Sequence, residues 1–351
     1  MIENSEAFAA PLRLRLDGEA LVANWRTLSK LSGSGATGAA VKADGYGVGA
    51  SEVSRRLWEA GCRDFFVAHW SEAVALSKVI PAQNIAVLNG IQLQDIPAIR
   101  ALDAVPVLNT PLQIEHWKTS GGGRCHVMLD SGINRLGIGP GQISSDLFNG
   151  LDIDMLCSHL ASADEDVPQN DAQLRLFTDM STGIACRRRS FANSAGIVLG
   201  KDFHFDLTRP GLSLYGGIAR AELAGNIRQV VFPSARVLQI REHEAGAPIG
   251  YNATYRTTGS KRIATLAIGY ADGYFRAFSA IGYVEIGGEK HPVLGRVSMD
   301  LVTVDITHVQ DVAEGDWIDI GFELHEASYA TGTSQYELLT GIGSRADRVW
   351  S

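Results

Sequence analysis

The sequence predicts an α/β fold: a (β/α)8 barrel of the TIM type followed by a mostly β domain. From about residue 17 to 222, eight short apolar runs alternate with amphipathic, charge-bearing stretches. Beyond residue 222 the apolar runs are short, rich in β-forming residues and separated by glycine-containing turns. Strands separated by helices over about 200 residues favour a parallel barrel. An open doubly wound sheet is the alternative for this part.

The strand candidates of the barrel are 39–43, 65–68, 85–89, 105–109, 125–130, 155–159, 190–193 and 205–209. Helical patterns lie between them, for example at 49–60, 70–79 and 170–181. In the last of these, Leu174, Phe177 and Met180 recur at helical spacing.

The second domain is expected to be antiparallel. Its strand candidates are 235–240, 262–268, 282–286, 291–294, 300–306 and 317–320, and no helix is expected before 335–340. The run 12–16, which alternates leucine and arginine, is expected to add a strand to this domain. The predicted parts are therefore 1–16, a strand packed on the second domain; 17–222, the barrel; and 223–351, the β-rich domain.

Composition excludes several classes of protein. The 351 residues include 31 basic and 39 acidic side chains, a net charge of −8, which argues against nucleic acid as a partner. No apolar run reaches the roughly 18 residues of a membrane span, and the first residues lack the apolar core of a signal peptide. The four cysteines form no C-x-x-C pair, so we expect neither a metal site nor disulfides. These features predict a cytoplasmic protein without a membrane partner.

Residues 33–38 (GSGATG) match the G-x-G-x-x-G pattern of dinucleotide-binding proteins. That pattern binds a pyrophosphate only where a strand enters the glycine turn and a helix leaves it. Here a helical stretch at 21–31 precedes the glycines and a strand follows them. We interpret the segment as a helix-to-strand loop.

The most informative segment is 40–49 (AVKADGYGVG). Lys42 ends the first predicted strand, at the face where barrel enzymes carry their chemistry. A lysine that loses solvent there has a lowered pKa and becomes a nucleophile toward carbonyl groups, whereas a solvated strand-end lysine is the ordinary alternative. Tyr46 and the neighbouring glycines offer a hydroxyl and amides to a phosphate.

This segment resembles the pyridoxal-phosphate lysine motif of the alanine racemase family, and further motifs of that family follow in order along nearly the whole chain. They are 130–137 (DSGINRLG), 158–164 (SHLASAD), 193–195 (NSA), 209–216 (RPGLSLYG), 250–255 (GYNATY), 268–274 (IGYADGY) and 295–300 (GRVSMD).

The resemblance implies that pyridoxal 5'-phosphate is attached to Lys42 and that two bases act on opposite faces of the substrate. Lys42 would be one base and Tyr251 the other. The cofactor is needed because no side-chain base alone removes the Cα proton of a free amino acid. A phenol has an ordinary pKa near 10, so nearby positive charge must lower that of Tyr251.

The resemblance also implies how the cofactor and substrate are held. Arg209 would face the pyridine nitrogen and keep it unprotonated, while His159 would pack beside the cofactor or, alternatively, be an ordinary strand-end histidine. The phosphate group would be held by Tyr46, Ser194, Gly211 and Leu212. The substrate would be bound by Arg135, Tyr270 and the amide of Met299.

In this family the tyrosine-bearing loops come from a partner subunit, which implies a homodimer with composite active sites. Taken singly, Tyr251 and Tyr270 could equally be core aromatics. Two departures from the family pattern matter. Met128 stands where many members have a lysine that is carbamylated and fixes the arginine, and Ser344 stands where many have a tyrosine that contacts the phosphate.

The sequence therefore predicts an alanine racemase that supplies D-alanine, for peptidoglycan in a bacterium. A racemase acting on serine or larger amino acids is an alternative, because Met128 and Ser344 alter the pocket. A decarboxylase of basic amino acids is disfavoured by Arg209, since those enzymes usually place an acid there. A cofactor-binding protein without turnover is disfavoured by the second domain.

Overall fold

The computed structural model describes residues 9–144 and 146–351 and divides into two compact units. One unit is Ala20–Arg228, and the other combines the chain up to Glu19 with Gln229–Ser351. Residues 1–8 of the segment predicted at 1–16 lie outside the described residues. No described helix has the length and apolar character needed to cross a bilayer.

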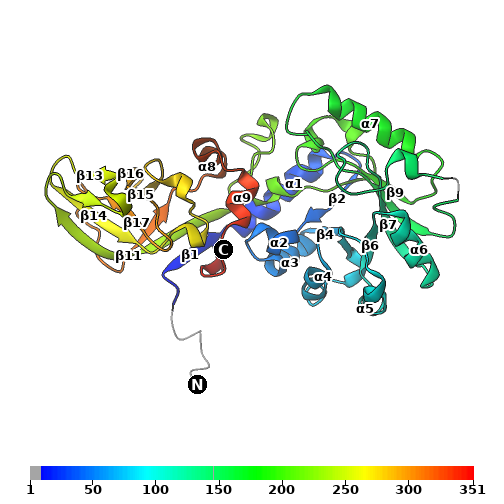
Figure 1. Cartoon of the computed structure of the whole chain (residues 1–351), viewed down its shortest axis with the longest axis horizontal. Helices are drawn as coiled ribbons and strands as arrows, with labels where there is room; N and C mark the ends of the chain where they lie inside the picture. The colour runs from blue at the N-terminus through cyan, green and yellow to red at the C-terminus, as the bar shows by residue number, and fades with distance from the viewer. Residues whose placement is uncertain (1–8, 145) are drawn as a thin grey trace, which may run out of the picture. The chain divides into compact units, whose positions relative to one another are not determined.

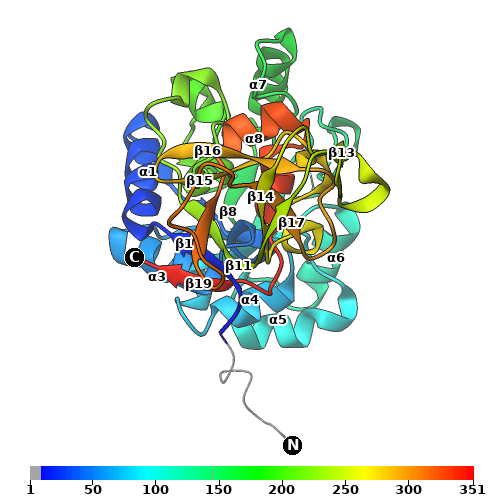
Figure 2. The same ribbon diagram turned by 90° about the vertical axis from the view of Figure 1, so that its left-hand side faces the viewer.

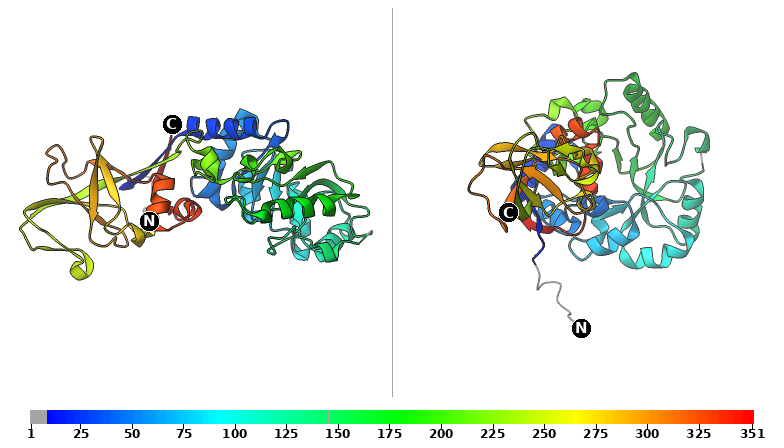
Figure 3. Two further views of the ribbon diagram at one scale, coloured as in Figure 1. Left: turned by 90° about the horizontal axis from the view of Figure 1, so that it is seen from above. Right: turned by 60° about the vertical axis from the view of Figure 1, so that its left-hand side comes forward.

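In the first unit, short parallel strands alternate with helices. Its strands are β2 (Ala36–Thr37), β3 (Ala39–Ala40), β4 (Phe65–Val67), β5 (Ile85–Val87), β6 (Val105–Leu108), β7 (Arg124–Met128), β8 (Asp152–Cys157), β9 (Arg188–Ser190) and β10 (Leu207–Thr208). Its helices are α1 (Gly18–Leu31), α2 (Lys42–Tyr46), α3 (Ala50–Ala60), α4 (Trp70–Leu76), α5 (Ile96–Leu102), α6 (Pro111–Thr119) and α7 (Pro168–Ser181). Helices α4–α7 lie outside the strands (Figure 1), and the right-hand view of Figure 3 shows the same arrangement.

The sheet runs β2-β10-β9-β8-β7-β6-β5-β4-β3. Its two end strands, β2 and β3, are the halves of one strand position of the barrel, interrupted at Gly38, and each such position is called a stave here. The Gly38 amide donates to Thr208 O at 2.9 Å, while the Ala39 amide donates to Asp64 O at 2.8 Å on the other side. A Cβ at Gly38 would lie only 2.7 Å from Asp64 O, so glycine is required there. The sheet therefore closes into the predicted eight-stave barrel, and the open-sheet alternative is wrong.

Apolar side chains from most of the staves fill the barrel. They are Phe66, Ala86, Val107, Met128, Met155, Cys157 and Leu207. Tight filling of this kind leaves the chemistry to the ends of the strands.

The predicted strands extend too far at their carboxyl ends. The predicted strand 39–43 ends at Ala40, 155–159 ends at Cys157, and 190–193 ends at Ser190. The regular ladder ends at these points, and only single main-chain bonds continue beyond them, such as those from the Val41 amide to Phe66 O at 2.9 Å and from the Ser158 amide to Ser190 O at 3.2 Å. Apolarity continues past the strand, so the sequence pattern does not mark the change.

The second unit is built on an eight-stranded sheet in the order β14-β17-β16-β15-β18-β11-β1-β19, with β14 also pairing with β11 (Figure 2). The strands are β1 (Leu12–Leu16), β11 (Val231–His243), β14 (Lys261–Leu266), β15 (Tyr283–Ile286), β16 (Glu289–Leu294), β17 (Val302–Asp305), β18 (Trp317–Ile320) and β19 (Asp347–Trp350), with a separate hairpin of β12 (Pro248–Ile249) and β13 (Tyr255–Arg256). The β14–β11 pairing closes six strands into a ring. Strand β1 pairs antiparallel with β11 and parallel with β19.

The prediction of no helix before 335–340 is wrong. Helix α8 (Leu324–Thr331) precedes α9 (Gln335–Thr340) and buries Leu324 and Ala327. Its eight residues carry few apolar side chains at helical spacing, so periodicity did not reveal it. The predicted order of helix before strand at 33–38 is correct, since α1 ends at Leu31, but the strand begins earlier than predicted, because β2 (Ala36–Thr37) lies within this segment.

Candidate active site

Lys42 lies two residues beyond β3, at the carboxyl end of the first stave, and is half-buried. The four residues after it, 43–46, have φ values of 53°, 52°, 62° and 56°, so α2 is a left-handed turn and not an ordinary helix. Left-handed backbone costs roughly 1–2 kcal/mol for each residue with a Cβ. Such a turn persists only where its surroundings hold it, which is typical of functional sites.

The turn leads Tyr46 into the barrel mouth. The Tyr46 ring stacks on Tyr215, with ring centroids 4.7 Å apart, and the Tyr215 hydroxyl donates to Ala40 O at 2.9 Å. A Cβ at Gly211 would overlap the Tyr46 hydroxyl and lie 2.9 Å from its Cζ. Glycine at 211 therefore allows the phenol to lie directly against the backbone of this loop.

Ser194 organises the same loop. Its Oγ accepts hydrogen bonds from the amides of Gly211 at 2.9 Å and Ser213 at 3.3 Å. Leu212 lies between these two residues, where a short 3-10 turn, Leu212–Tyr215, begins. The Ser213 hydroxyl oxygen is buried with no hydrogen-bond partner among the described residues. Amides and hydroxyls thus gather at one point, which suits an anion with several acceptor oxygens.

The guanidinium of Arg209 is buried at the ends of two neighbouring strands. It donates to the carbonyl of Ser158 at 2.5 Å and to the hydroxyl of Ser190, and it lies 5.9 Å from the ring of Phe66. Burial lowers the pKa of Arg209. None of the carboxylates in the described part of the chain is paired with this cation, so its charge is available to the barrel mouth.

The lowered pKa of His159 reflects both its burial and the positive charge of the barrel mouth. Burial lowers its pKa to about 3, and the positive charges of Arg209, Arg135 and Lys42 add to the effect. The imidazole is therefore neutral near pH 7. Four of the predicted site residues, Lys42, Arg135, His159 and Arg209, are close enough to interact electrostatically, and the field they share is positive.

Arg135 is exposed on a loop after β7. Asp130 fixes that loop by accepting from the amides of Gly132 at 2.9 Å and Asn134 at 3.1 Å, and from that of Arg135 itself at 3.2 Å. Met128, in the position of the family's carbamylated lysine, is buried in the barrel interior, with its sulfur 3.8 Å from that of Cys157. Met128 thus belongs to the apolar core and offers Arg135 no acceptor.

Tyr251, Tyr270 and Met299 lie in the second unit. Tyr251 begins a short turn in the β12–β13 hairpin, and its side chain is 65% exposed. Tyr270 and Met299 lie in adjoining turns, because the Tyr270 amide donates to Ser298 O and the Ala271 amide to Met299 O, both at 3.0 Å. The structure therefore groups eight predicted residues in the barrel unit and these three in the β-rich unit.

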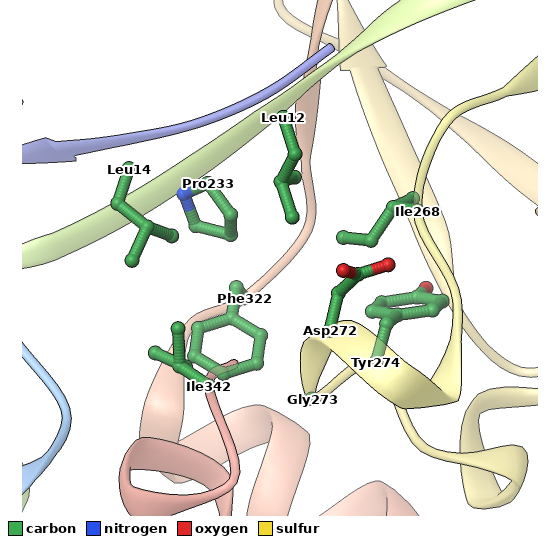
Figure 4. Close-up of a pocket in the computed structure, with 9 residues that line it drawn as sticks. All are labelled: Leu12, Leu14, Pro233, Ile268, Asp272, Gly273, Tyr274, Phe322 and Ile342. Atoms are coloured by element: carbon green, nitrogen blue, oxygen red, sulfur yellow. The ribbon is translucent and has the colours of Figure 1, made fainter. Parts of the chain in front are cut away.

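Ser344 is exposed, but the residue after it joins two of these turns. Arg345 donates from Nε to Asp272 at 2.8 Å and from Nη1 to Asp300 at 2.7 Å. Asp272 follows Tyr270 by two positions and Asp300 follows Met299. Figure 4 shows the Asp272 carboxylate facing a mostly apolar, water-sized cavity of about 10 Å³, beside Ile268, Tyr274 and Phe322.

Sequence reasoning missed three residues of this site: Tyr215, Arg345 and Glu72, whose carboxylate accepts from the amide of Ala43 at 2.6 Å. Glu72 had a visible local signal, since a glutamate three positions after the residue preceding a helix is typical of a capping box. Tyr215 lies within the motif 209–216, but the motif gave it no role, because its contacts with Ala40 and Tyr46 join distant segments. Arg345 had no signal, because its two partners are also distant in the sequence. In the part of the chain that the structure describes, no group of three or more His, Cys, Asp or Glu could hold a metal ion.

Comparison with known proteins matches this arrangement. Residues 16–219 match the model of the alanine racemase N-terminal domain, and residues 230–350 that of the alanine racemase C-terminal domain. An alanine racemase of Jannaschia sp. (strain CCS1) is 44% identical over 340 residues, which cover 96% of this chain and 98% of that protein. A biosynthetic alanine racemase of Agrobacterium fabrum is 39% identical over 370 residues, covering 97% and 94%.

Solved structures agree. The alanine racemase of Bartonella henselae with covalently bound pyridoxal phosphate has a TM-score of 0.90 and 35% identity, with 98% of this chain and 100% of that chain covered. The biosynthetic alanine racemase of Pseudomonas aeruginosa has a TM-score of 0.87 and 30% identity, with the same coverage. The family predicted from the motifs is confirmed. This chain belongs to the alanine racemase family.

Proposed function

We propose that this protein is a pyridoxal-phosphate-dependent isomerase that interconverts L-alanine and D-alanine. The observation that carries the proposal is the shared positive field of Lys42, Arg135 and Arg209 around a neutral His159, at the carboxyl ends of the barrel strands. Such a field attracts a dianionic phosphate and a substrate carboxylate.

The barrel residues fit the cofactor. The unpartnered Ser213 hydroxyl, the amides around Ser194 and the close approach of Tyr46 to Gly211 form a cradle for the phosphate group. Burial and the charge of Arg135 lower the pKa of Lys42, which favours the neutral amine that attaches to an aldehyde. When bound, the cofactor supplies an electron sink for the charge left on Cα.

The roles of the protein groups follow from the chemistry of racemisation. Lys42 takes or returns the Cα proton on one face, and Tyr251 does so on the other. Arg209 keeps the pyridine nitrogen unprotonated, and His159 packs beside the cofactor. The substrate carboxylate is bound by Arg135, whose planar fork matches it, and by the amide of Met299, with Tyr270 lining the pocket.

Tyr251 and Met299 are exposed, at 65% and 54%, although both carry proposed site roles. This exposure supports a homodimer in which the β-rich unit of one copy completes the barrel of the other. We further propose an N-terminal strand to residue 16, a barrel over 17–222 and a β-rich domain over 223–351, with the enzyme in the cytoplasm supplying D-alanine for peptidoglycan.

A racemisation assay tests the function. The purified protein, supplied with pyridoxal phosphate in deuterated water, would receive L-alanine, L-serine or L-lysine, and the D-enantiomer would be quantified by chiral chromatography. Alanine is expected to turn over fastest. Comparable turnover of serine or lysine would support a broader racemase and make Met128 and Ser344 the positions to exchange next. No turnover with cofactor bound would overturn the proposal.

A further inference from the structure

The carboxylate of Glu72, on α4, connects the first two staves of the barrel beside Lys42. Its Oε1 accepts from the amide of Ala43 at 2.6 Å. Its Oε2 accepts from the amides of Ala68 at 2.7 Å and His69 at 3.0 Å. One side chain thereby holds the residue after Lys42 and the two residues after β4.

Helix capping explains only half of this arrangement. His69 precedes α4 and Glu72 is the third residue of that helix, so the bond from the His69 amide to Oε2 completes a capping box. The bond from Ala43 to Oε1 spans 29 positions of sequence and does nothing for α4. The Ala43 bond uses Oε1, the carboxylate oxygen that does not take part in helix capping.

Glu72 affects Lys42 through its hydrogen bond with the Ala43 amide. Ala43 begins the left-handed turn at φ 53°, and the peptide between Lys42 and Ala43 fixes the direction from which the lysine side chain leaves the backbone. Because left-handed backbone is costly for alanine, this peptide needs an external partner to keep its orientation. Glu72 supplies the acceptor for that amide.

Charge acts in addition to geometry. Burial and Arg135 lower the pKa of Lys42, whereas the Glu72 carboxylate raises it. The same carboxylate therefore orients the backbone at Lys42 and offsets part of the positive field in which the amine lies.

We propose that Glu72 is a positioning residue for Lys42, which locks the left-handed turn to the second stave and so aims the lysine amine at its cofactor and at one face of the substrate. This rests on the proposed attachment of the cofactor to Lys42. Glu72 touches neither substrate nor cofactor in this role and acts through the backbone of Ala43.

The test compares Glu72→Gln and Glu72→Asp with Glu59→Gln in the complete enzyme. Glutamine keeps the size of Glu72 but has only one acceptor oxygen, so it cannot serve both staves. Aspartate keeps the charge but is one methylene shorter. Glu59, on α3, is the matched control because its carboxylate is 60% exposed and forms an ion pair with Arg55 at the protein surface.

The first readout is hydrogen exchange of the peptide that contains residues 43–47, measured by mass spectrometry. Loss of a bond to a charged acceptor is expected to speed exchange there by about tenfold in both Glu72 variants and not in Glu59→Gln. Wild-type exchange in both Glu72 variants would overturn the proposal.

The second readout is the deuterium isotope effect with α-deuterated L-alanine and D-alanine. Misplacement of the amine is expected to lower kcat by about 10- to 100-fold with little change in KM, and to raise the isotope effect for the one enantiomer whose proton Lys42 removes. Equal changes for both enantiomers would show a general structural defect and overturn the positioning role.

A third measurement separates this proposal from the function it rests on. Borohydride reduction of the wild-type enzyme, followed by peptide mapping, identifies the lysine that carries the cofactor. Attachment at Lys42 combined with unchanged Glu72 variants would overturn the positioning role alone. Attachment at another lysine would overturn the assignment of Lys42 and this inference with it.

Discussion

Arg345 and Asp272 form an ion pair of 2.8 Å in which the carboxylate is buried, with 5% of its side chain exposed, and the arginine is half exposed. Asp272 also accepts from the amide of Gly269 at 3.0 Å, at the start of the Tyr270 turn. Since Arg345 binds Asp300 as well, one side chain fixes the two turns that carry Tyr270 and Met299.

Replacing Arg345 by alanine should therefore loosen both turns. We expect KM for alanine to rise by about tenfold and the free energy of unfolding to fall by about 1–3 kcal/mol, because a buried carboxylate loses its charged partner. Steady-state kinetics and urea unfolding measure the two effects. Arg241→Ala, at an exposed position of β11, is the control. A normal KM in Arg345→Ala would show that the ion pairs of Arg345 with Asp272 and Asp300 do not support substrate binding.

Lys42→Ala should abolish turnover, with a loss of at least about a thousandfold, because both the cofactor attachment and one base disappear. The visible absorbance of lysine-bound cofactor should vanish, and borohydride reduction should no longer add the cofactor mass to the protein. Retained turnover would rule out Lys42 as the attachment residue.

Gly211→Ala should weaken the phosphate cradle. The added methyl group overlaps the Tyr46 hydroxyl and lies 3.4 Å from the Ala40 side chain, so the tyrosine must move. We expect a stability loss of about 1–3 kcal/mol and weaker cofactor binding, measured by titration of the cofactor-free protein. Gly141→Ala is the control, since a Cβ there meets no atom within 4 Å. Equal cofactor affinity in the two variants would contradict the proposed cradle.

Tyr251→Phe should keep the cofactor and lose proton transfer on one face. Exchange of the Cα proton with deuterated solvent is expected to fall by about 10²- to 10⁴-fold for one enantiomer only, in line with removal of a general base. Tyr329→Phe, at a 91% exposed tyrosine, controls for loss of a phenol elsewhere. Normal exchange from both enantiomers in Tyr251→Phe would exclude this residue as the second base.

Acid should destabilise the folded protein before its carboxylates titrate. Burial lowers the pKa of His159 to about 3 and also lowers that of His126, which lies near Asp154, Arg124, Arg188 and Arg209. Between the ordinary value of about 6.5 and about 3, the unfolded chain binds protons that the folded chain does not, so stability falls as the pH falls.

Urea unfolding at several pH values tests this dependence. His126→Asn should show a shallower decline below pH of about 6.5 than the wild type, because one of the two groups is gone. His325→Asn replaces an exposed histidine and serves as the control. An unchanged slope in His126→Asn would mean that this imidazole is not kept neutral by the fold.

The alternation of apolar runs and amphipathic stretches was enough to predict the barrel, because that rhythm is imposed by burial on both faces of every strand. It could not predict the left-handed turn after Lys42, since Ala43 and Tyr46 are residue types that rarely adopt positive φ. The turn exists because Glu72 and the residues around it hold it, and that is a property of packing.

The site likewise contains residues that a sequence motif predicts and residues that only the folded structure brings into place. Lys42, Arg209 and the Gly211 loop could be predicted because each forms part of a short motif with fixed local spacing. Arg345 could not, because its two partners lie 73 and 45 positions away and only the folded sheet brings them together. A motif contains the groups that meet the ligand, whereas the groups that orient them are scattered.

The pairing of β1 with β19 has a consequence for the order of folding. Strand β1 is made before the barrel, but its parallel neighbour, Asp347–Trp350, is made after the whole barrel. Residues 20–228 can therefore close their ring during translation, while Leu12–Leu16 can pair with Val231–His243 but keeps its other edge unpaired until β19 is made. A nascent chain halted near residue 300 should contain a protease-resistant barrel and an incomplete second unit, in which chaperones would find the edge of β1 that later pairs with β19 accessible.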